Sequence, residues 1–260
     1  MQSFQLYEPG SSFLYRMDPR VKLIAVAAVF TVSVLFQDAR YLAPVFVFLL
    51  GVAVAGRVPL RRVALLLKSL AVLVAISMVM WPLIYRQGEV VFEVVGLGVT
   101  DAGLRYGMGM SFRILDMVIA PIILFLTTPQ SDFVAGLRRL GLPYRAAFAL
   151  AMAFRFLPTV AGVGQTIVEA QRARGMDPSA GGVRQRIRNH SRILGPLVIT
   201  SLRIAQQTIL AVEARAFSIG RPRTTFKSLT FRPVDTFAVV FLVAVVVAAA
   251  ALRLQGRGVL

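Results

Sequence analysis

The sequence contains no cysteine and little acid. Among its 260 residues there is one His and there are only 12 Asp and Glu. Without cysteine the chain can form no disulfide, thiolate nucleophile or Cys-ligated metal site. His190 cannot form a metal cluster alone, and the carboxylates are scattered without the paired spacing that a metal-dependent membrane transferase needs. These absences disfavour an enzyme.

The sequence also lacks a nucleotide-binding motif. No Gly-x-x-x-x-Gly-Lys-[Ser/Thr] run occurs, so the chain has no P-loop for ATP. We therefore expect no catalytic residue, cofactor or metal in this chain. Any ATP hydrolysis that drives it must come from a partner.

Apolar residues dominate what is present. The chain is 57% hydrophobic and 16% charged, with a mean hydropathy of +0.72, which is too apolar for a soluble domain of this size. The bilayer is the expected solvent. The net charge of +17 is typical of cytoplasmic retention of Lys and Arg beside an acidic protein or lipid partner, and no nucleic-acid motif accompanies it.

Five segments are apolar enough to cross a bilayer, which takes about 20 largely apolar residues. They are residues 21–36, 41–56, 63–85, 102–127 and 234–252. The first two are short and are joined by a tight turn, Gln37-Asp38-Ala39-Arg40. The sequence thus predicts an all-α, polytopic membrane protein: residues 1–127 with four spans, a cytoplasmic domain of amphipathic helices in 128–232, and a fifth span and tail in 233–260.

Basic residues in the loops indicate the orientation, because Lys and Arg resist translocation. Residues 57–68 hold four basic residues and no acid, and residues 128–232 hold 16 basic and 4 acidic residues. Residues 86–101 carry one Arg against three acids. We expect the first two of these segments and the N-terminus in the cytoplasm, and the third segment and the C-terminus outside.

The cytoplasmic segment holds two further apolar stretches, 146–163 and 193–212. Each would place an Arg near the middle of a span, at a cost of about 2.5–3.5 kcal/mol. Their helical periodicity instead predicts amphipathic helices whose apolar stripes pack on each other. The stripes are Phe156, Val160, Val163 and Ile167 in the first and Leu194, Val198, Leu202 and Ile209 in the second.

The same two helices end in similar sequences. Val168-Glu169-Ala170-Gln171-Arg172-Ala173-Arg174-Gly175 closes the first, and Val212-Glu213-Ala214-Arg215-Ala216-Phe217 closes the second. One Arg at a helix end is explained by the helix macrodipole alone. Two matched arginines flanked by small residues are better explained as guanidinium groups that enter a partner's groove. Gly175 and Gly220 are candidate left-handed C-caps, as is Gly141 after a shorter helix at Ser131–Leu140 that Ser131 could cap.

The fourth expected span contains ionisable residues. Arg105, Arg113 and Asp116 lie where such groups normally face protein or water. Arg113 and Asp116 are three residues apart and could pair on one helix face, although contact with a partner subunit stays open. Gly103 and Gly107 form a Gly-x-x-x-Gly pattern that is compatible with close helix approach.

Several motifs together resemble the transmembrane T component of energy-coupling factor (ECF) transporters, the EcfT/CbiQ family. They are Tyr15-Arg16-Met17-Asp18-Pro19-Arg20-Val21-Lys22-Leu23, Thr127-Thr128-Pro129, Leu137-Arg138-Arg139-Leu140-Gly141-Leu142-Pro143, Arg155-Phe156-Leu157-Pro158 and Gln171-Arg172-Ala173-Arg174-Gly175. The resemblance covers nearly the whole chain.

The resemblance implies a transmembrane energy-coupling subunit of an ABC importer in a prokaryotic cell membrane. Two cytoplasmic helices would end in Ala-Arg-Gly-like motifs, here Ala173-Arg174-Gly175 and Ala214-Arg215-Ala216, that dock on a pair of ABC ATPases. ATP and Mg would bind in those partners. A membrane S component would capture the micronutrient, a vitamin or a cobalt or nickel ion. The second motif departs from the family pattern, since Ala216 stands where Gly is usual and disfavours a left-handed cap.

Two other functions stay open from the residues alone. A self-sufficient carrier or channel should show a polar site at the membrane midplane and often repeated spans, neither of which is clear here. A membrane enzyme that acts on phosphorylated lipid through the basic face is disfavoured by the sparse acids. Co-purification with two ATPase chains separates the coupling subunit from both.

Overall fold

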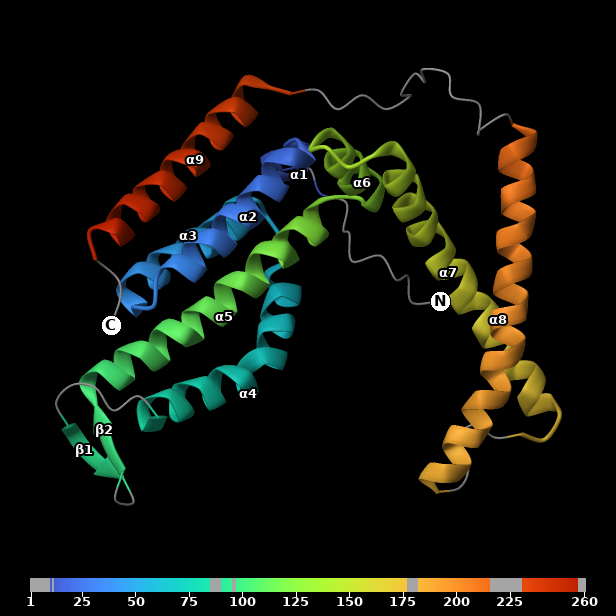
Figure 1. Ribbon diagram of the computed structural model, residues 1–260, viewed down its shortest axis with the longest axis horizontal. Helices are drawn as coiled ribbons and strands as arrows, with labels where there is room; N and C mark the ends of the chain where they lie inside the picture. The colour runs from blue at the N-terminus through green and yellow to red at the C-terminus, as the bar shows by residue number, and fades with distance from the viewer. Residues whose placement is uncertain are drawn as a thin grey trace. The chain divides into compact units, whose positions relative to one another are not determined.

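The computed structural model describes residues 10, 12–84, 90–94, 97–176, 182–215 and 231–256. This part is almost wholly helical, as the sequence predicts (Figure 1). Its elements are α1 (Phe13–Arg16), α2 (Pro19–Leu35), α3 (Ala39–Ala55), α4 (Leu60–Ile84), β1 (Val90–Val94), β2 (Leu97–Thr100), α5 (Asp101–Thr127), α6 (Gln130–Arg139), α7 (Tyr144–Ala173), α8 (Val183–Ala214) and α9 (Pro233–Leu254).

The small antiparallel hairpin β1–β2 was not predicted. It lies between α4 and α5, in the segment that the charge pattern places outside the membrane. Its valines and phenylalanine favour extended backbone, and the paired strands satisfy each other's polar groups.

The chain divides into two compact units. The smaller contains Phe148–Ser228, and the larger contains Gln5–Ala147 together with Leu229–Leu260. The cytoplasmic domain predicted from the sequence starts at residue 128, which is 20 residues before the start of this smaller unit at Phe148. Helix α6 belongs to the larger unit because it packs on α2: a Cβ at Gly136 of α6 would lie 3.0 Å from the Cβ of Pro19.

Five described helices are long and apolar enough to cross a membrane, but they are not the five segments expected. Helices α4, α5 and α9 match expected spans. The other two are α7 and α8, of 30 and 32 residues, which qualify by length and apolar composition alone. The expected first two spans form α2 and α3 of 17 residues each, at the short end of what spans a bilayer. The tight turn between α2 and α3 is confirmed.

In the larger unit, α5 lies at the centre of the packing. Helices α2, α3 and α4 all contact it, and α9 covers the far side of α2. Glycines allow the close approach: a Cβ on Gly107 would lie 3.0 Å from Cδ of Pro82 in α4, and one on Gly109 would collide with the backbone oxygen of Gln37. The Gly-x-x-x-Gly segment therefore does lie at a helix contact, as predicted.

In the smaller unit, α7 and α8 cross (Figure 1). A Cβ on Gly164 of α7 would lie 3.8 Å from Cδ1 of Leu197 in α8. The expected stripe on α7 is partly covered. The expected stripe on α8 was wrong, because Leu194, Val198, Leu202 and Ile209 are each more than half exposed. The partly covered face of α8 instead carries Leu197, Ser201, Ile204 and Thr208. The middle of α8 is apolar on several sides, so its periodicity did not determine which side meets α7.

Candidate functional site

The first predicted coupling motif forms the C-terminal cap of α7. Arg174 follows the last helical residue, and Gly175 adopts a left-handed conformation with φ of 81°. The amide of Gly175 donates to the carbonyl of Arg172 at 2.9 Å, and that of Met176 donates to the carbonyl of Gln171 at 3.0 Å. This pair of bonds is the Schellman motif, which favours glycine at the left-handed position. The predicted cap at Gly175 is confirmed, and so is the one at Gly141, where φ is 116°.

The second predicted motif lies at the C-terminal end of α8. Ala214 is the last helical residue, and Arg215 follows it with φ of −89° and ψ of 16°. Its amide donates to the carbonyl of Glu213. Ala216, and the alternative cap Gly220, lie outside the described residues.

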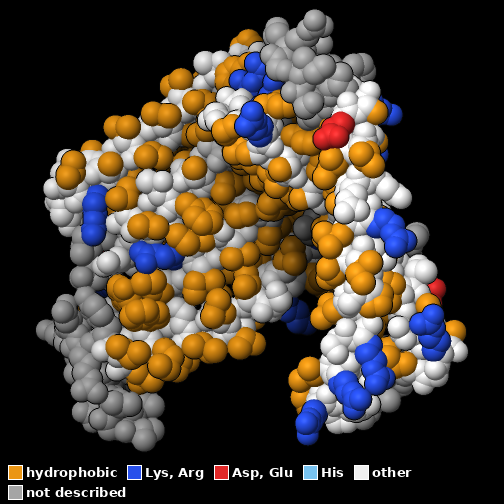
Figure 2. Space-filling model, turned by 45° about the vertical axis from the view of Figure 1, so that its right-hand side comes forward, with side chains coloured by type: hydrophobic (Ala, Val, Ile, Leu, Met, Phe, Trp, Pro, Cys, Tyr) orange, Lys and Arg blue, Asp and Glu red, His pale blue; other side chains and the backbone are white. Residues whose placement is uncertain are grey.

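Both arginines are exposed at the tips of long helices. Arg174 and Arg215 are exposed, as are the alanines that precede them. The two tips lie at opposite ends of the crossed pair, because α7 and α8 run in opposite directions along the smaller unit (Figure 1). Blue Lys and Arg side chains stand out along these helices in the space-filling view (Figure 2). The pair thus presents two separate cationic tips.

The intramembrane arginine Arg113 does not pair with Asp116, and that interpretation is corrected here. The Nε atom of Arg113 donates to the carbonyl of Ser33 at 2.7 Å, and a terminal nitrogen donates to the carbonyl of Phe36. Carbonyls at a helix C-terminus have no partner within the helix. Arg113 satisfies those of α2, and this demand outweighs an i, i+3 pair on its own helix.

Asp116 is wholly buried on α5. Neither of its carboxyl oxygens has a hydrogen-bond partner among the described residues. Arg105, the third expected residue, forms an ion pair of 2.6 Å with Asp101 one turn earlier. Both of those side chains are substantially exposed, so this pair contributes little to stability. The structure therefore separates the three residues that the sequence analysis grouped.

A buried lysine joins two motifs whose roles the sequence did not show. Nζ of Lys22, at the start of α2, donates to the hydroxyl of Thr128 at 2.9 Å, the carbonyl of Thr127 at 3.0 Å and the hydroxyl of Thr127 at 3.2 Å. Lys22 is only 6% exposed. Its three ammonium hydrogens thus meet three oxygens at the C-terminal end of α5. A cation at a helix C-terminus is also favoured by the macrodipole.

The same region is hydrogen-bonded to the start of the last helix, α9. The amide of Asp18 donates to Oδ1 of Asp235 at 3.2 Å, and the amide of Arg232 donates to Oδ2 of Asp235 at 2.9 Å. Asp235 is almost fully buried at the first turn of α9. We call Asp18, Lys22, Thr127, Thr128 and Asp235 the polar cluster. Its sequence signal was a Lys within the first turn of an apolar helix, a position that demands buried partners.

Within the described residues, no group of three or more His, Cys, Asp or Glu is placed to hold a metal ion. His190 lies on α8, where its Nδ1 is 2.8 Å from the carbonyl of Arg186 one turn earlier. Ser131 is not the cap of α6, because the helix begins at Gln130 after Pro129 and the Ser131 hydroxyl donates to Asp132.

Comparison with known proteins identifies the family. The CbiQ family, described as cobalt transport protein, matches residues 10–226. The chain belongs to the CbiQ/EcfT family. It is 32% identical over 249 residues to the energy-coupling factor transporter transmembrane protein EcfT of Brevibacillus brevis, covering 93% of this chain and 94% of that protein. It is 29% identical over 245 residues to EcfT of Bacillus subtilis, covering 91% and 92%.

Membership in the CbiQ/EcfT family confirms the resemblance seen in the sequence motifs. The chain is accordingly a multi-pass membrane protein of a transport system, with apolar helices to match. The family match covers Asp18, Lys22, Thr127 and Thr128 of the polar cluster. It also covers Arg174 and Arg215.

The correction at Arg113 leads to a measurable difference between two variants. Arg113→Met removes a charged donor and leaves carbonyls of Ser33 and Phe36 unpaired, which should cost about 1–3 kcal/mol of stability. Asp116→Asn replaces an unpartnered carboxyl with a neutral group of similar shape and removes no hydrogen bond, so it should destabilise the chain less than Arg113→Met. Unfolding of the purified chain in detergent checks both. Equal destabilisation of several kcal/mol would indicate a buried ion pair instead.

Proposed function

We propose that the chain is the transmembrane energy-coupling subunit of an ECF-type ABC importer. The observation that carries this is the presence of two exposed arginine tips on two long crossed helices, in a chain that has no nucleotide-binding motif of its own. The names of its relatives support it, since they are energy-coupling factor transporter transmembrane proteins.

Each tip would dock on one of two ABC ATPase subunits. Helices of 30 and 32 residues are about 45 and 48 Å long at 1.5 Å per residue, and their C-terminal tips lie at opposite ends of the pair. That separation suits two different protein surfaces better than one. A guanidinium beside alanines has little around it to block bidentate contacts with a carboxylate-lined groove. ATP and Mg would be held by those partner chains.

The exposed stripe of α8 would meet a further partner. Leu194, Val198, Leu202 and Ile209 are 55–59% exposed and lie on one side of the helix. Such a continuous apolar surface normally marks a protein or membrane contact. We assign it to the membrane S component that captures the micronutrient, a vitamin or a cobalt or nickel ion. The description of the family as cobalt transport protein supports the metal ions among these.

Coupling would then follow from relative motion of α7 and α8. The two helices touch where Leu197 meets Gly164, and few of their residues are buried in the structure. When the ATPase pair closes or opens, the tips that ride on it are drawn together or apart, and the stripe on α8 carries this motion to the S component. Rigid helices that shift at an interface transmit motion of this kind.

The orientation that we propose places the N-terminus in the cytoplasm and the C-terminus outside the cell membrane. It rests on the basic excess of residues 128–232. The chain has no native cysteine, so single cysteines can be labelled without background. Ser131→Cys and Arg188→Cys should react only with a reagent that enters the cytoplasm, whereas Gln255→Cys should react with an impermeant reagent from outside. The reverse pattern would invert the topology.

The arginine tips give the sharpest functional test. An arginine that anchors an interface costs about 2 kcal/mol or more on truncation, roughly thirtyfold in affinity, whereas a surface arginine that only complements a helix dipole costs under about 1 kcal/mol. Arg174→Ala and Arg215→Ala should each weaken co-purification of the ATPases and lower uptake. The double variant should be more severely affected.

Arg145→Ala and Arg203→Ala are matched controls, since both residues are exposed arginines on α7 and α8 away from the motifs. They should retain assembly and uptake. If the double tip variant copurifies with its ATPases and transports at the parental rate, the motifs are only helix caps. Transport by the lone purified chain would favour a self-sufficient carrier, and turnover of phosphorylated lipid by it would favour an enzyme.

A further inference from the structure

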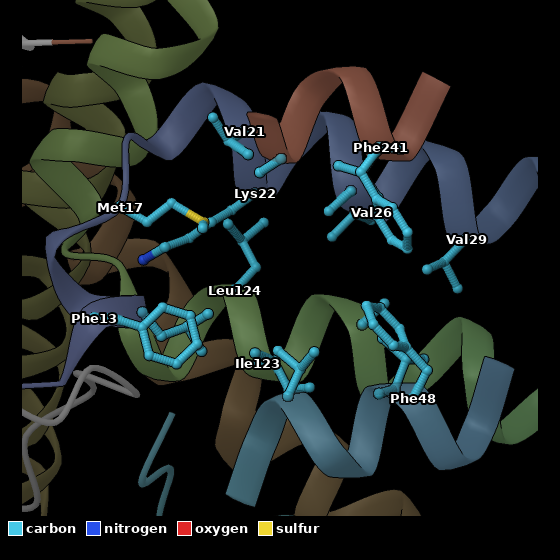
Figure 3. A pocket seen from close by; sticks show the side chains of 17 residues that line it. Phe13, Met17, Val21, Lys22, Val26, Val29, Phe48, Ile123, Leu124 and Phe241 are labelled. Carbon is cyan, nitrogen blue, oxygen red and sulfur yellow. The ribbon is translucent and has the colours of Figure 1, made fainter. Parts of the chain in front are cut away.

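An apolar cavity of about 240 Å³ lies inside the larger unit. Residues of α1, α2, α3, α5 and α9 surround it, so it sits where the first, third and last helices come closest to α2 and α5 (Figure 3). All of its lining side chains but one are hydrophobic. An empty space of this kind forfeits packing contacts on every wall. In a membrane protein, lipid hydrocarbon chains are available to occupy such a cavity.

The ammonium group of Lys22, the one charged lining residue, is already bonded to the protein and does not face the cavity as a free donor. Lys22 contributes its aliphatic stem to the wall, while its Nζ is held by Thr127 and Thr128. Each ammonium hydrogen therefore has a protein oxygen. A polar ligand would find no partner inside the cavity, whereas an acyl chain needs none.

One side of the cavity lies close to the surface of the chain. Phe48 of α3 and Phe241 of α9 line it at the end away from Phe13 (Figure 3). Their ring centroids are 6.1 Å apart, and the two side chains are 49% and 45% exposed. Helix α9 is long and apolar enough to cross a membrane, and Phe241 lies in its third turn. The two rings are close enough to contact each other and thus form a half-exposed wall of the cavity between α3 and α9.

The other end of the cavity is basic. Phe13 and Met17 line it, and the exposed Arg16 lies on the same short helix α1. Arg232, also exposed, precedes α9 and is brought to this end because Asp235 accepts hydrogen bonds from both the Arg232 and Asp18 amides. Two elements therefore supply cations at the end of a hydrocarbon-lined space. Basic residues at the cytoplasmic surface of a membrane attract anionic lipid headgroups.

We propose that this cavity is a binding site for one anionic phospholipid, with an acyl chain between α2, α3, α5 and α9 and the headgroup beside Arg16 and Arg232. The site goes beyond the proposed coupling function and involves neither arginine tip. A bound lipid would fill the space beneath α1 and support the packing of α9 on α2.

The full chain, purified in detergent and titrated with phosphatidylglycerol, tests the site by native mass spectrometry. Ala25 lines the cavity on α2, whereas Ala27, two residues along the same helix, is exposed outside it. Ala25→Phe should weaken binding of one phosphatidylglycerol at least tenfold, and Ala27→Phe should leave it unchanged. Ala238→Leu fills the cavity from α9 and should act like Ala25→Phe, which keeps the test open if Ala25→Phe does not fold.

The headgroup assignment is tested separately with phosphatidylcholine. The double variant Arg16→Gln/Arg232→Gln should lose most of the preference for phosphatidylglycerol over phosphatidylcholine, while Arg61→Gln, an exposed arginine at the start of α4, should keep it. Equal binding by the Ala25 and Ala27 variants, or an unaltered preference in the double arginine variant, would overturn the proposal. If a partner subunit fills the cavity instead, Ala25→Phe and Ala238→Leu leave lipid binding unchanged and reduce co-purification with a membrane partner.

Discussion

The structure of the larger unit depends on how it accommodates one buried ammonium group. Lys22 lies at the start of an apolar helix, where an unpaired charge would be prohibitively costly. Three oxygens of Thr127 and Thr128 meet its hydrogens and so fix the start of α2 against the end of α5. Asp18 and Asp235 extend the polar cluster to α9. At the other end of α2, Arg113 satisfies the free carbonyls. Helices far apart in the sequence are thereby held at both ends by polar contacts that lipid cannot replace.

The helices of the smaller unit are much less buried than α5. In the apolar windows of α7 and α8 only 6% of the residues are buried, against 44% in α5. Helix α9 is as little buried, but Asp235 bonds it to the larger unit. Helices α7 and α8 are therefore held only weakly by burial, and their exposed apolar and cationic groups are available to partners. A firmly tied unit and two sparsely packed long helices are the division that the proposed mechanical coupling needs: one part would stay in place in the bilayer while the other would follow the ATPases.

Much of this could be predicted from local signals in the sequence. Hydropathy and Gly141 and Gly175 predicted helices and their ends, because those features act within a few residues. What failed required knowledge of neighbouring helices. The spacing of Arg113 and Asp116 allows a pair, but only the fold places the end of α2 beside Arg113. The apolar residues of α8 surround its middle, so only Leu197 beside Gly164 reveals its buried side. Lys22 and Thr127 are 105 residues apart, and no local pattern connects them.

The central claim is that α7 and α8 move relative to each other as the ATPases cycle while the tied helices do not. Spin labels at Ala170 and Gln206, exposed on α7 and α8, and at Ala27 and Val240, exposed on α2 and α9, can report this in the assembled complex in lipid nanodiscs. Pulsed electron paramagnetic resonance should give one distance for the Ala170–Gln206 pair in the nucleotide-free complex and a different distance in the complex with a non-hydrolysable ATP analogue. The Ala27–Val240 distance should be the same in both. An unchanged Ala170–Gln206 distance would contradict the account.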